Sequence, residues 1–178
     1  IPYGDSPLDA NKLGERVYMD ILNRAQRYVH VMTPYLILDG EMETALKLAA
    51  ERGVDVTLIL PGVPDKKSAY ALAKGHFASL LRSGVRIYTY TPGFVHAKVF
   101  VSDDREAVVG TINLDYRSLF LHFEDGVWLC DAPCIHDIER DFQDTLTLSE
   151  PITLRRFRHL NILLQLYRSI LRVFAPLM

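Results

Sequence analysis

A histidine, a lysine and an aspartate stand at fixed spacing in the stretch VHAKVFVSD. His96, Lys98 and Asp103 form the pattern H-x-K-x4-D. A neutral imidazole is both a nucleophile and a proton carrier near neutral pH. A phosphodiester carries a negative charge that repels nucleophiles and grows toward the transition state, and a lysine held beside the histidine offsets that charge. The first two residues of the pattern therefore suit phosphoryl transfer.

More polar residues follow the pattern closely. Thr111 and Asn113, in the sequence GTIN, supply hydroxyl and amide donors that can hold phosphate oxygens. They come just after an apolar run that is typical of a strand, and binding groups collect at strand ends. Glu124 is a candidate to orient a reacting imidazole through its second ring nitrogen. The set predicts phosphoryl transfer through a phosphohistidine, with no metal and no other cofactor.

Strands and helices that alternate along the chain must position these residues. On an expected strand at 95–102, alternate side chains share a face, so His96 and Lys98 point the same way. Such alternation predicts an α/β fold, a mixed β-sheet sandwiched by α-helices. The other expected strands cover 28–32, 54–60, 85–90, 106–110 and 126–131, and the expected helices cover 10–27, 39–53, 65–84, 114–120 and 135–147.

Charge divides the chain into two unequal parts. It has 20 basic and 22 acidic residues; all the acidic ones lie within 1–150 and five arginines lie beyond, so 1–150 carries −7 and 151–178 carries +5. We expect a catalytic unit over 1–150 and a basic amphipathic helix over 151–178. That helix suits an anionic bilayer surface. Alternatively, it packs on the rest of the protein as an ordinary terminal helix.

Composition and charge exclude several classes of protein. The net charge of −2 argues against binding of nucleic acid by bulk electrostatics. No apolar run approaches the roughly 20 residues of a membrane-spanning helix. Cys130 and Cys134 have no second cysteine pair, so a zinc site is not expected. The sequence begins without an initiator methionine, and we expect a fragment of a longer protein or a processed product.

The motif and its surroundings resemble a known family. The pattern H-x-K-x4-D followed by G-T-x-N is similar to the signature of the phospholipase D superfamily, and VHAKVFVSDDREAVVGTINLDYRSLFLHFEDGVWL resembles the second catalytic half of a bacterial cardiolipin synthase. The resemblance covers nearly the whole chain. It implies a phospholipase D-like α-β-α sandwich and a phosphatidyltransferase of the bacterial plasma membrane. Such enzymes join two phosphatidylglycerols into cardiolipin, release glycerol and need no metal.

The resemblance also implies roles for individual residues. His96 matches the motif histidine, which acts as nucleophile or as general acid, and the sequence leaves that choice open. Lys98 and Asn113 match the phosphate-contacting residues. Glu124 matches the acid that orients a catalytic imidazole. Thr111 stands where serine is common and supports the phosphate contacts.

Other matched residues lie around this centre. Asp103 matches the motif aspartate, whose role is mostly structural. Arg117 is a candidate contact for a lipid phosphate, or it pairs with Asp115. Tyr35 either lines the site or only shapes a loop. The remaining headgroup candidates are the arginines at the start of the basic tail: Arg155, Arg156 and Arg158.

The family's active site uses two such motifs, and this chain has one. None of the other histidines has a lysine two positions later: His30, His76, His122, His136 and His159. We therefore expect one half-site, completed by a second half-domain in a longer polypeptide or by a homodimer. The isolated chain is expected to be soluble or peripheral and inactive as a monomer. The alternatives are a homodimeric phosphodiesterase or nuclease and a non-catalytic membrane-binding module.

Overall fold

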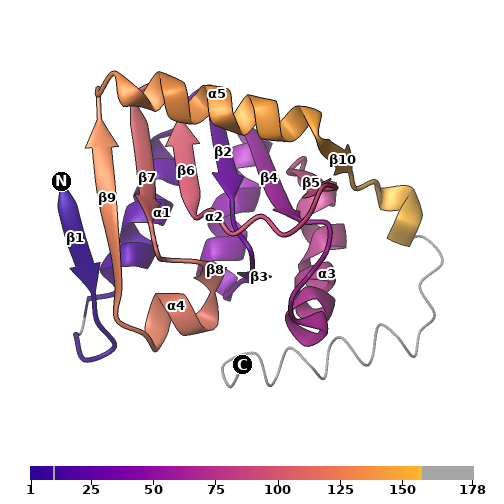
Figure 1. Ribbon diagram of the computed structural model, residues 1–178, viewed down its shortest axis with the longest axis horizontal. Helices are drawn as coiled ribbons and strands as arrows, with labels where there is room; N and C mark the ends of the chain where they lie inside the picture. Colours follow the sequence, from indigo (N-terminus) through magenta and orange to yellow (C-terminus); the bar gives the residue numbers. More distant parts are fainter. Residues whose placement is uncertain (10, 158–178) are drawn as a thin grey trace.

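The computed structural model describes residues 1–9 and 11–157, and within them one mixed sheet of eight strands forms the centre (Figure 1). Its strand order is β1-β9-β7-β6-β2-β4-β5-β10. The middle strands β2, β4 and β5 are parallel, and every other neighbouring pair is antiparallel. The strands are β1 (Pro2–Asp5), β2 (Tyr28–Met32), β4 (Asp55–Pro61), β5 (Arg86–Tyr90), β6 (Val99–Ser102), β7 (Glu106–Gly110), β9 (Glu124–Cys130) and β10 (Ser149–Pro151).

Helices cover both faces of this sheet, which confirms the predicted α/β sandwich. One face carries α1 (Leu13–Arg24), α2 (Gly40–Glu51) and α3 (Lys67–Arg82), and the other carries α5 (Cys134–Thr147) (Figure 1). The short helix α4 (Tyr116–Phe120) lies at one end of the sheet, beside a small parallel pair of strands, β3 (Leu36–Ile37) and β8 (Leu114–Asp115).

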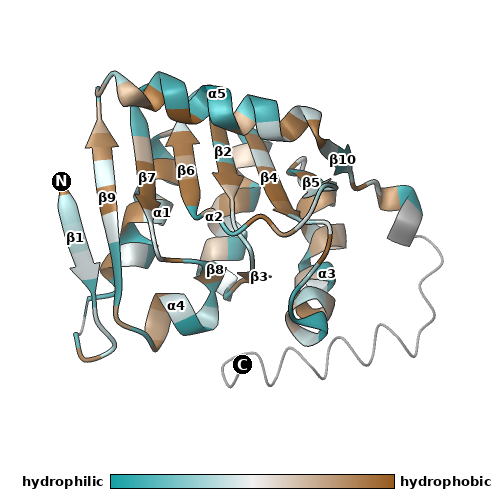
Figure 2. Cartoon of the chain, in the orientation of Figure 1, coloured by the Kyte–Doolittle hydropathy of each residue, from teal (hydrophilic) through white to brown (hydrophobic). Residues whose placement is uncertain are grey.

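Burial on both faces explains the composition of the central strand β2. Val29 and Val31 pack in the core beneath α1 and α2, and Met32 packs against α5. His30 also faces α5, where its Nδ1 lies 2.9 Å from the carboxylate of Glu139. The central strands are accordingly hydrophobic along most of their length, whereas the outer side of α5 is hydrophilic (Figure 2).

The predicted strand at 95–102 is wrong at its beginning, because β6 starts at Val99. Its partner β2 ends at Met32, which pairs with Val99, and Thr33 and Pro34 then lead the chain away. Residues 94–98 therefore form no ladder with β2 and lie in an irregular segment before β6, although the carbonyl oxygen of Lys98 still accepts from the backbone N–H of Gly110 in β7 at 3.4 Å. The sequence also gave no sign of the short strands β1, β3, β8 and β10.

The described part of the tail packs on the first part of the chain. β10 crosses the predicted division at residue 150 and pairs with β5, and Ile152 is buried in the core. A short 3-10 turn, Leu154–Phe157, follows. Residues 151–157 of the predicted amphipathic helix form the end of β10, a connecting segment and this turn, so the prediction is wrong there, and the rest of the predicted helix, 158–178, lies outside the described residues. Among the residues described, no helix has the length and apolar character needed to cross a membrane.

A partly buried carboxylate with partners on two helices generates a stability prediction. Glu43 in α2 lies 2.8 Å from Nδ1 of His76 in α3 and 2.6 Å from the ammonium of Lys47. The hydrogen bond with His76 is the largest cause that lowers the pKa of Glu43 far below its ordinary value, against the opposing effect of burial. This stabilisation is present above the unfolded pKa of about 4.3 and is lost as the pH falls toward the folded pKa.

We therefore expect Glu43→Gln to lower the free energy of unfolding at pH 7 by about 2 kcal/mol. The loss of stability of the variant between pH 5 and pH 3 should be shallower than that of the wild type. Urea unfolding across this range measures both effects. The control is Glu41→Gln, an exposed residue of the same helix, which should shift stability by less than about 0.5 kcal/mol. Parallel pH profiles for wild type and Glu43→Gln would contradict the assignment.

Candidate active site

Strand direction brings the predicted residues to one edge of the sheet. β6 runs antiparallel to β2 and β7, and β9 runs antiparallel to β7. The start of β6 therefore lies at the same edge as the end of β7 and the start of β9. His96 and Lys98 precede β6, Thr111 and Asn113 follow β7, and Glu124 opens β9. In Figure 1 this is the lower edge, where β8 and α4 lie.

His96 and Lys98 are joined through the backbone. The His96 side chain is exposed, and its ring stacks on that of Phe94 with 5.5 Å between centroids. Nζ of Lys98 donates a hydrogen bond to the carbonyl oxygen of His96 at 2.8 Å. Partial burial lowers the pKa of Lys98, and the carboxylates of Glu124 and Asp115 oppose that shift. The ammonium of Lys98 is thus held at the backbone of a residue whose imidazole is accessible.

The turn after β7 is held by its contact with β9. A Cβ atom on Gly110 would lie 2.3 Å from the carbonyl oxygen of Asp125, so no larger residue fits there. Thr111 donates its backbone N–H to the same oxygen at 2.8 Å, and its Oγ1 accepts from the backbone N–H of Asp125 at 3.0 Å. The Thr111 hydroxyl is therefore engaged with the backbone. This geometry fits a supporting role in the site.

Asn113 is held inside the same turn. Its Nδ2 donates to Oγ of Ser118 at 2.9 Å, and its Oδ1 is buried without a partner among the described residues. Because an amide nitrogen carries two N–H groups, the second can donate to a phosphate oxygen while Oδ1 stays available to a hydroxyl donor. Tyr18, fully buried, donates its hydroxyl to the carbonyl oxygen of Ile112 at 2.9 Å. The main chain at this position is therefore fixed from the core.

Asp115 is the second carboxylate that acts on Lys98. Its Oδ1 accepts from the backbone N–H of Ser118 at 2.7 Å and so caps α4. Burial is the largest cause that raises the pKa of Asp115. The role of this residue was not foreseen beyond a pairing with Arg117, and that pairing is absent from the described part of the chain, where Arg117 is exposed and forms no ion pair.

Glu124 has a histidine partner that the sequence interpretation missed. Its side chain is only 9% exposed, and its Oε1 lies 3.7 Å from Nδ1 of His122. The ring of His96 forms no hydrogen bond within residues 1–9 and 11–157, and in these residues the imidazole near Glu124 is that of His122. The spacing H-x-E at the start of β9 was the available signal for His122.

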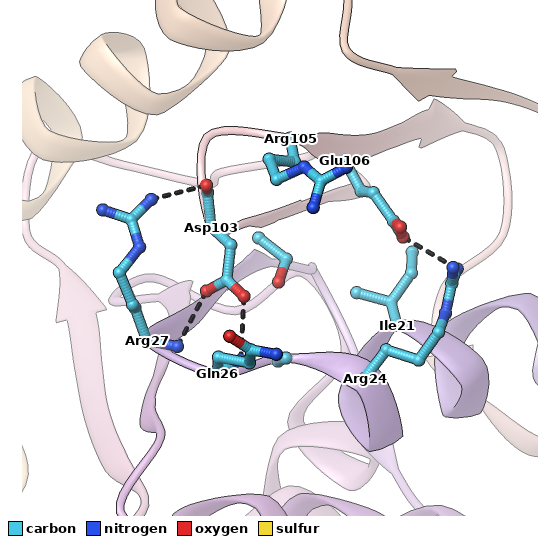
Figure 3. A pocket seen from close by; sticks show the side chains of 9 residues that line it. Ile21, Arg24, Gln26, Arg27, Asp103, Arg105 and Glu106 are labelled. Carbon is cyan, nitrogen blue, oxygen red and sulfur yellow. Dashed lines mark hydrogen bonds and ion pairs between the residues drawn. The ribbon is translucent and has the colours of Figure 1, made fainter.

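The structure does not bring Asp103 to this edge. It lies at the opposite end of β6, with a left-handed φ of 56°. Its carboxylate accepts from the backbone N–H groups of Gln26, Arg27 and Tyr28 at 2.8, 2.9 and 2.9 Å (Figure 3). Asp103 therefore fastens the loop between α1 and β2. This agrees with the mostly structural role that the resemblance implies.

The headgroup candidates are divided between two places. Tyr35 donates to Oδ2 of Asp65 at 2.5 Å, and burial, aided by that bond, raises its pKa to about 12. It lines a cavity together with Arg117 and Asn113. Arg155 is exposed in the 3-10 turn that also contains Arg156, and Arg158 lies outside the described residues. No cluster of metal-binding side chains occurs in the described part of the chain.

Comparison with known sequences points to one family in each case. A profile described as "Cardiolipin synthase, PLD-like domain" matches residues 18–146. An uncharacterized protein of Streptococcus mutans is 57% identical over the whole chain, which spans 39% of that protein. A cardiolipin synthase of Clostridium perfringens is 40% identical over 90% of the chain, and cardiolipin synthase 2 of Bacillus anthracis is 36% identical over 92%. The chain spans 34% and 32% of the length of those two proteins.

Comparison with solved structures supports the fold. The phospholipase D family member Nuc of Salmonella typhimurium matches with a TM-score of 0.70 and 18% identity, over 85% of this chain and 99% of that one. The phosphatidylserine synthase of Haemophilus influenzae matches with a TM-score of 0.72 and 19% identity, over 99% of this chain and 45% of that one. These matches extend over nearly all of the sandwich described above.

The contacts of Asp103 predict a loss of stability on its removal. Asp103→Ala leaves three backbone N–H groups without their acceptor and places an alanine at a positive φ, so we expect a loss of about 3 kcal/mol in the free energy of unfolding. Urea unfolding measures it. Asp131→Ala also places an alanine at a positive φ, of 48°, but it removes only an exposed partner of Arg105, so it should cost no more than about 1 kcal/mol. Equal effects of the two changes would exclude the fastening role.

Proposed function

The chain belongs to the cardiolipin synthase family of phospholipase D-like domains, and from this membership we propose that it supplies one half of a phosphatidyltransferase active site. The observation that carries the proposal is the ammonium of Lys98, bonded to the backbone of His96 at the edge of the sheet. A fixed cation beside an exposed imidazole stabilises the charge that develops on a phosphodiester. Asn113 lies at the same edge and is a further candidate contact for the phosphate.

The reaction that fits this site is transfer of a phosphatidyl group between two phosphatidylglycerols. One imidazole attacks the phosphorus of the donor lipid, so that a P–N bond forms and the P–O bond to the leaving glycerol breaks. A second imidazole gives its proton to that glycerol. The hydroxyl of the acceptor lipid then attacks phosphorus, its proton returns to the second imidazole, and the P–N bond breaks. The products are cardiolipin and free glycerol, and the steps balance without a metal.

His96 takes either of the two roles, and the other imidazole comes from a second motif. The family relatives are much longer than this chain, which leaves room in them for a second half-domain. A homodimer is the other arrangement that supplies two histidines. Lys98 and Asn113 hold phosphate oxygens in either arrangement, Thr111 fixes their turn, and Glu124 is placed to orient an imidazole that approaches from the partner half.

An anionic phospholipid substrate requires a membrane surface. We place the whole protein at the bacterial plasma membrane, with this part of it soluble or peripheral. Arg155, Arg156 and Arg158 at the start of the +5 segment then contact anionic headgroups. The net charge of −2 gives no corresponding reason to expect nucleic acid as substrate.

Removal of His96 tests the proposal. In an assembly that contains two motifs, either the longer protein or a homodimer, His96→Ala should lower cardiolipin production from phosphatidylglycerol vesicles by at least about 100-fold, because an imidazole in either role contributes that much. Thin-layer separation of labelled lipids measures the product. His136→Ala is the control, since His136 is 70% exposed and close to Asp104 at the opposite end of the sheet. Undiminished production after His96→Ala would contradict the proposal.

Assays of the same two-motif assembly discriminate the alternative functions, a nuclease and a membrane-binding module. Nicking of plasmid DNA by a homodimer, lost in His96→Ala, would point to a nuclease instead. Binding to anionic vesicles without turnover in any two-motif assembly would point to a membrane-binding module. Turnover by a verified monomer would overturn the half-site.

A further inference from the structure

A cavity of about 360 Å³ opens beside the proposed phosphate site. Asn113 and Asp115 belong to its wall, and Asp115 is one of the two carboxylates that act on Lys98. The cavity therefore adjoins the candidate phosphate site at Asn113. Its volume falls within the roughly 300–1,000 Å³ of pockets that take small ligands.

The outer part of this cavity carries positive charge that no carboxylate neutralises. Lys66 and Arg117 line it, both are exposed, and neither forms an ion pair with any residue in the described ranges. Lys66 lies over the ring of Tyr35, with Nζ 5.5 Å from its centroid. Ser68 lines the same wall from the first turn of α3, a helix that begins without a side-chain cap. These groups favour an anion at the mouth of the cavity.

The larger cavity at the opposite end of the sheet is different. It has a volume of about 470 Å³ and is also lined by arginines (Figure 3). Each of them already has an acidic partner, however. Arg24 pairs with Glu106, Arg27 with Asp104 and Arg105 with Asp131. An anion would gain little there, so the positive charge available for a ligand lies on the side of His96.

The inner part of the cavity beside His96 offers acceptors instead of cations. Oδ1 of Asn113 is buried and has no partner among the described residues. Asp115, 8% exposed, uses Oδ1 to cap α4. His122, whose side chain is 48% exposed, also lines the cavity, 3.7 Å from Glu124. A ligand that matches both parts has a hydroxyl group at its inner end and a phosphodiester a few atoms away at its outer end.

We propose that this cavity binds the headgroup of the acceptor lipid, with its hydroxyl facing Asn113 and Asp115 and its own phosphodiester on Lys66 and Arg117. The assignment rests on the proposed phosphatidyl transfer and names the site that selects the acceptor. The hydroxyl oxygen bonds to the phosphorus of the phosphatidyl-histidine, the P–N bond breaks, and the hydroxyl proton passes to the second imidazole. An acceptor with its own phosphate is thereby favoured over water and uncharged alcohols.

The test compares two acceptors in one two-motif assembly. Cardiolipin formation from phosphatidylglycerol uses a charged acceptor. Incorporation of deuterated glycerol into phosphatidylglycerol uses an uncharged one and passes through the same phosphatidyl-enzyme. In the double variant Lys66→Ala/Arg117→Ala, we expect cardiolipin formation to fall by about tenfold more than glycerol incorporation does, because contacts with the acceptor phosphate are lost. Mass spectrometry follows both products.

Matched variants separate this effect from a general loss of charge. Lys67→Ala removes the adjacent lysine, which is exposed and does not line the cavity, and it should leave the ratio of the two rates unchanged. Arg117→Lys keeps the charge and should retain most of the wild-type ratio. Equal losses in both reactions, or an unchanged ratio in the double variant, would overturn the acceptor site. Absence of both products from the wild type would instead remove the phosphatidyl transfer on which it rests.

Discussion

The position of one partly buried ammonium group, that of Lys98, is the constraint on which the rest of the site depends. Burial alone disfavours its charge, and the carboxylates of Glu124 and Asp115 compensate. One of its N–H groups is taken by the backbone of His96. The others remain for an anion. In the proposed transfer, a phosphodiester held by this cation lies near His96, and the short sequence H-x-K then serves binding and alignment together.

The scaffold makes this alignment rigid from the opposite side. The turn that carries Asn113 is fixed by a glycine pressed against the backbone of Asp125, by the two hydrogen bonds of Thr111, and by the buried hydroxyl of Tyr18. Such groups lose little freedom when a substrate binds, which is how polar sites stabilise charge at low reorganisation cost. The third member of the motif, Asp103, stabilises the fold from the far end of β6, where it holds the loop between α1 and β2.

The candidate site residues could be predicted from the sequence more completely than the structure that surrounds them. The apolar runs of β2, β4 and β7 predicted buried strands because both of their faces are covered. The start of β6 could not be read from alternation, since it depends on where the partner strand β2 ends. The cavity with Lys66 and Arg117 depends on loops that meet only in the folded chain. The local sequence pattern carries no information about contacts between segments that are distant in the sequence.

The central claim is that Lys98 and His96 hold one phosphodiester between them. NMR titration of the protein with short-chain phosphatidylglycerol, below its micelle concentration, tests it most directly through the ring signals of His96. The account predicts a saturable shift of these signals in the wild type and in Lys67→Met, and affinity weaker by about tenfold or more in Lys98→Met, because a charge-assisted contact is lost. An equal affinity in Lys98→Met, or shifts confined to His136 at the opposite end of the sheet, would contradict it.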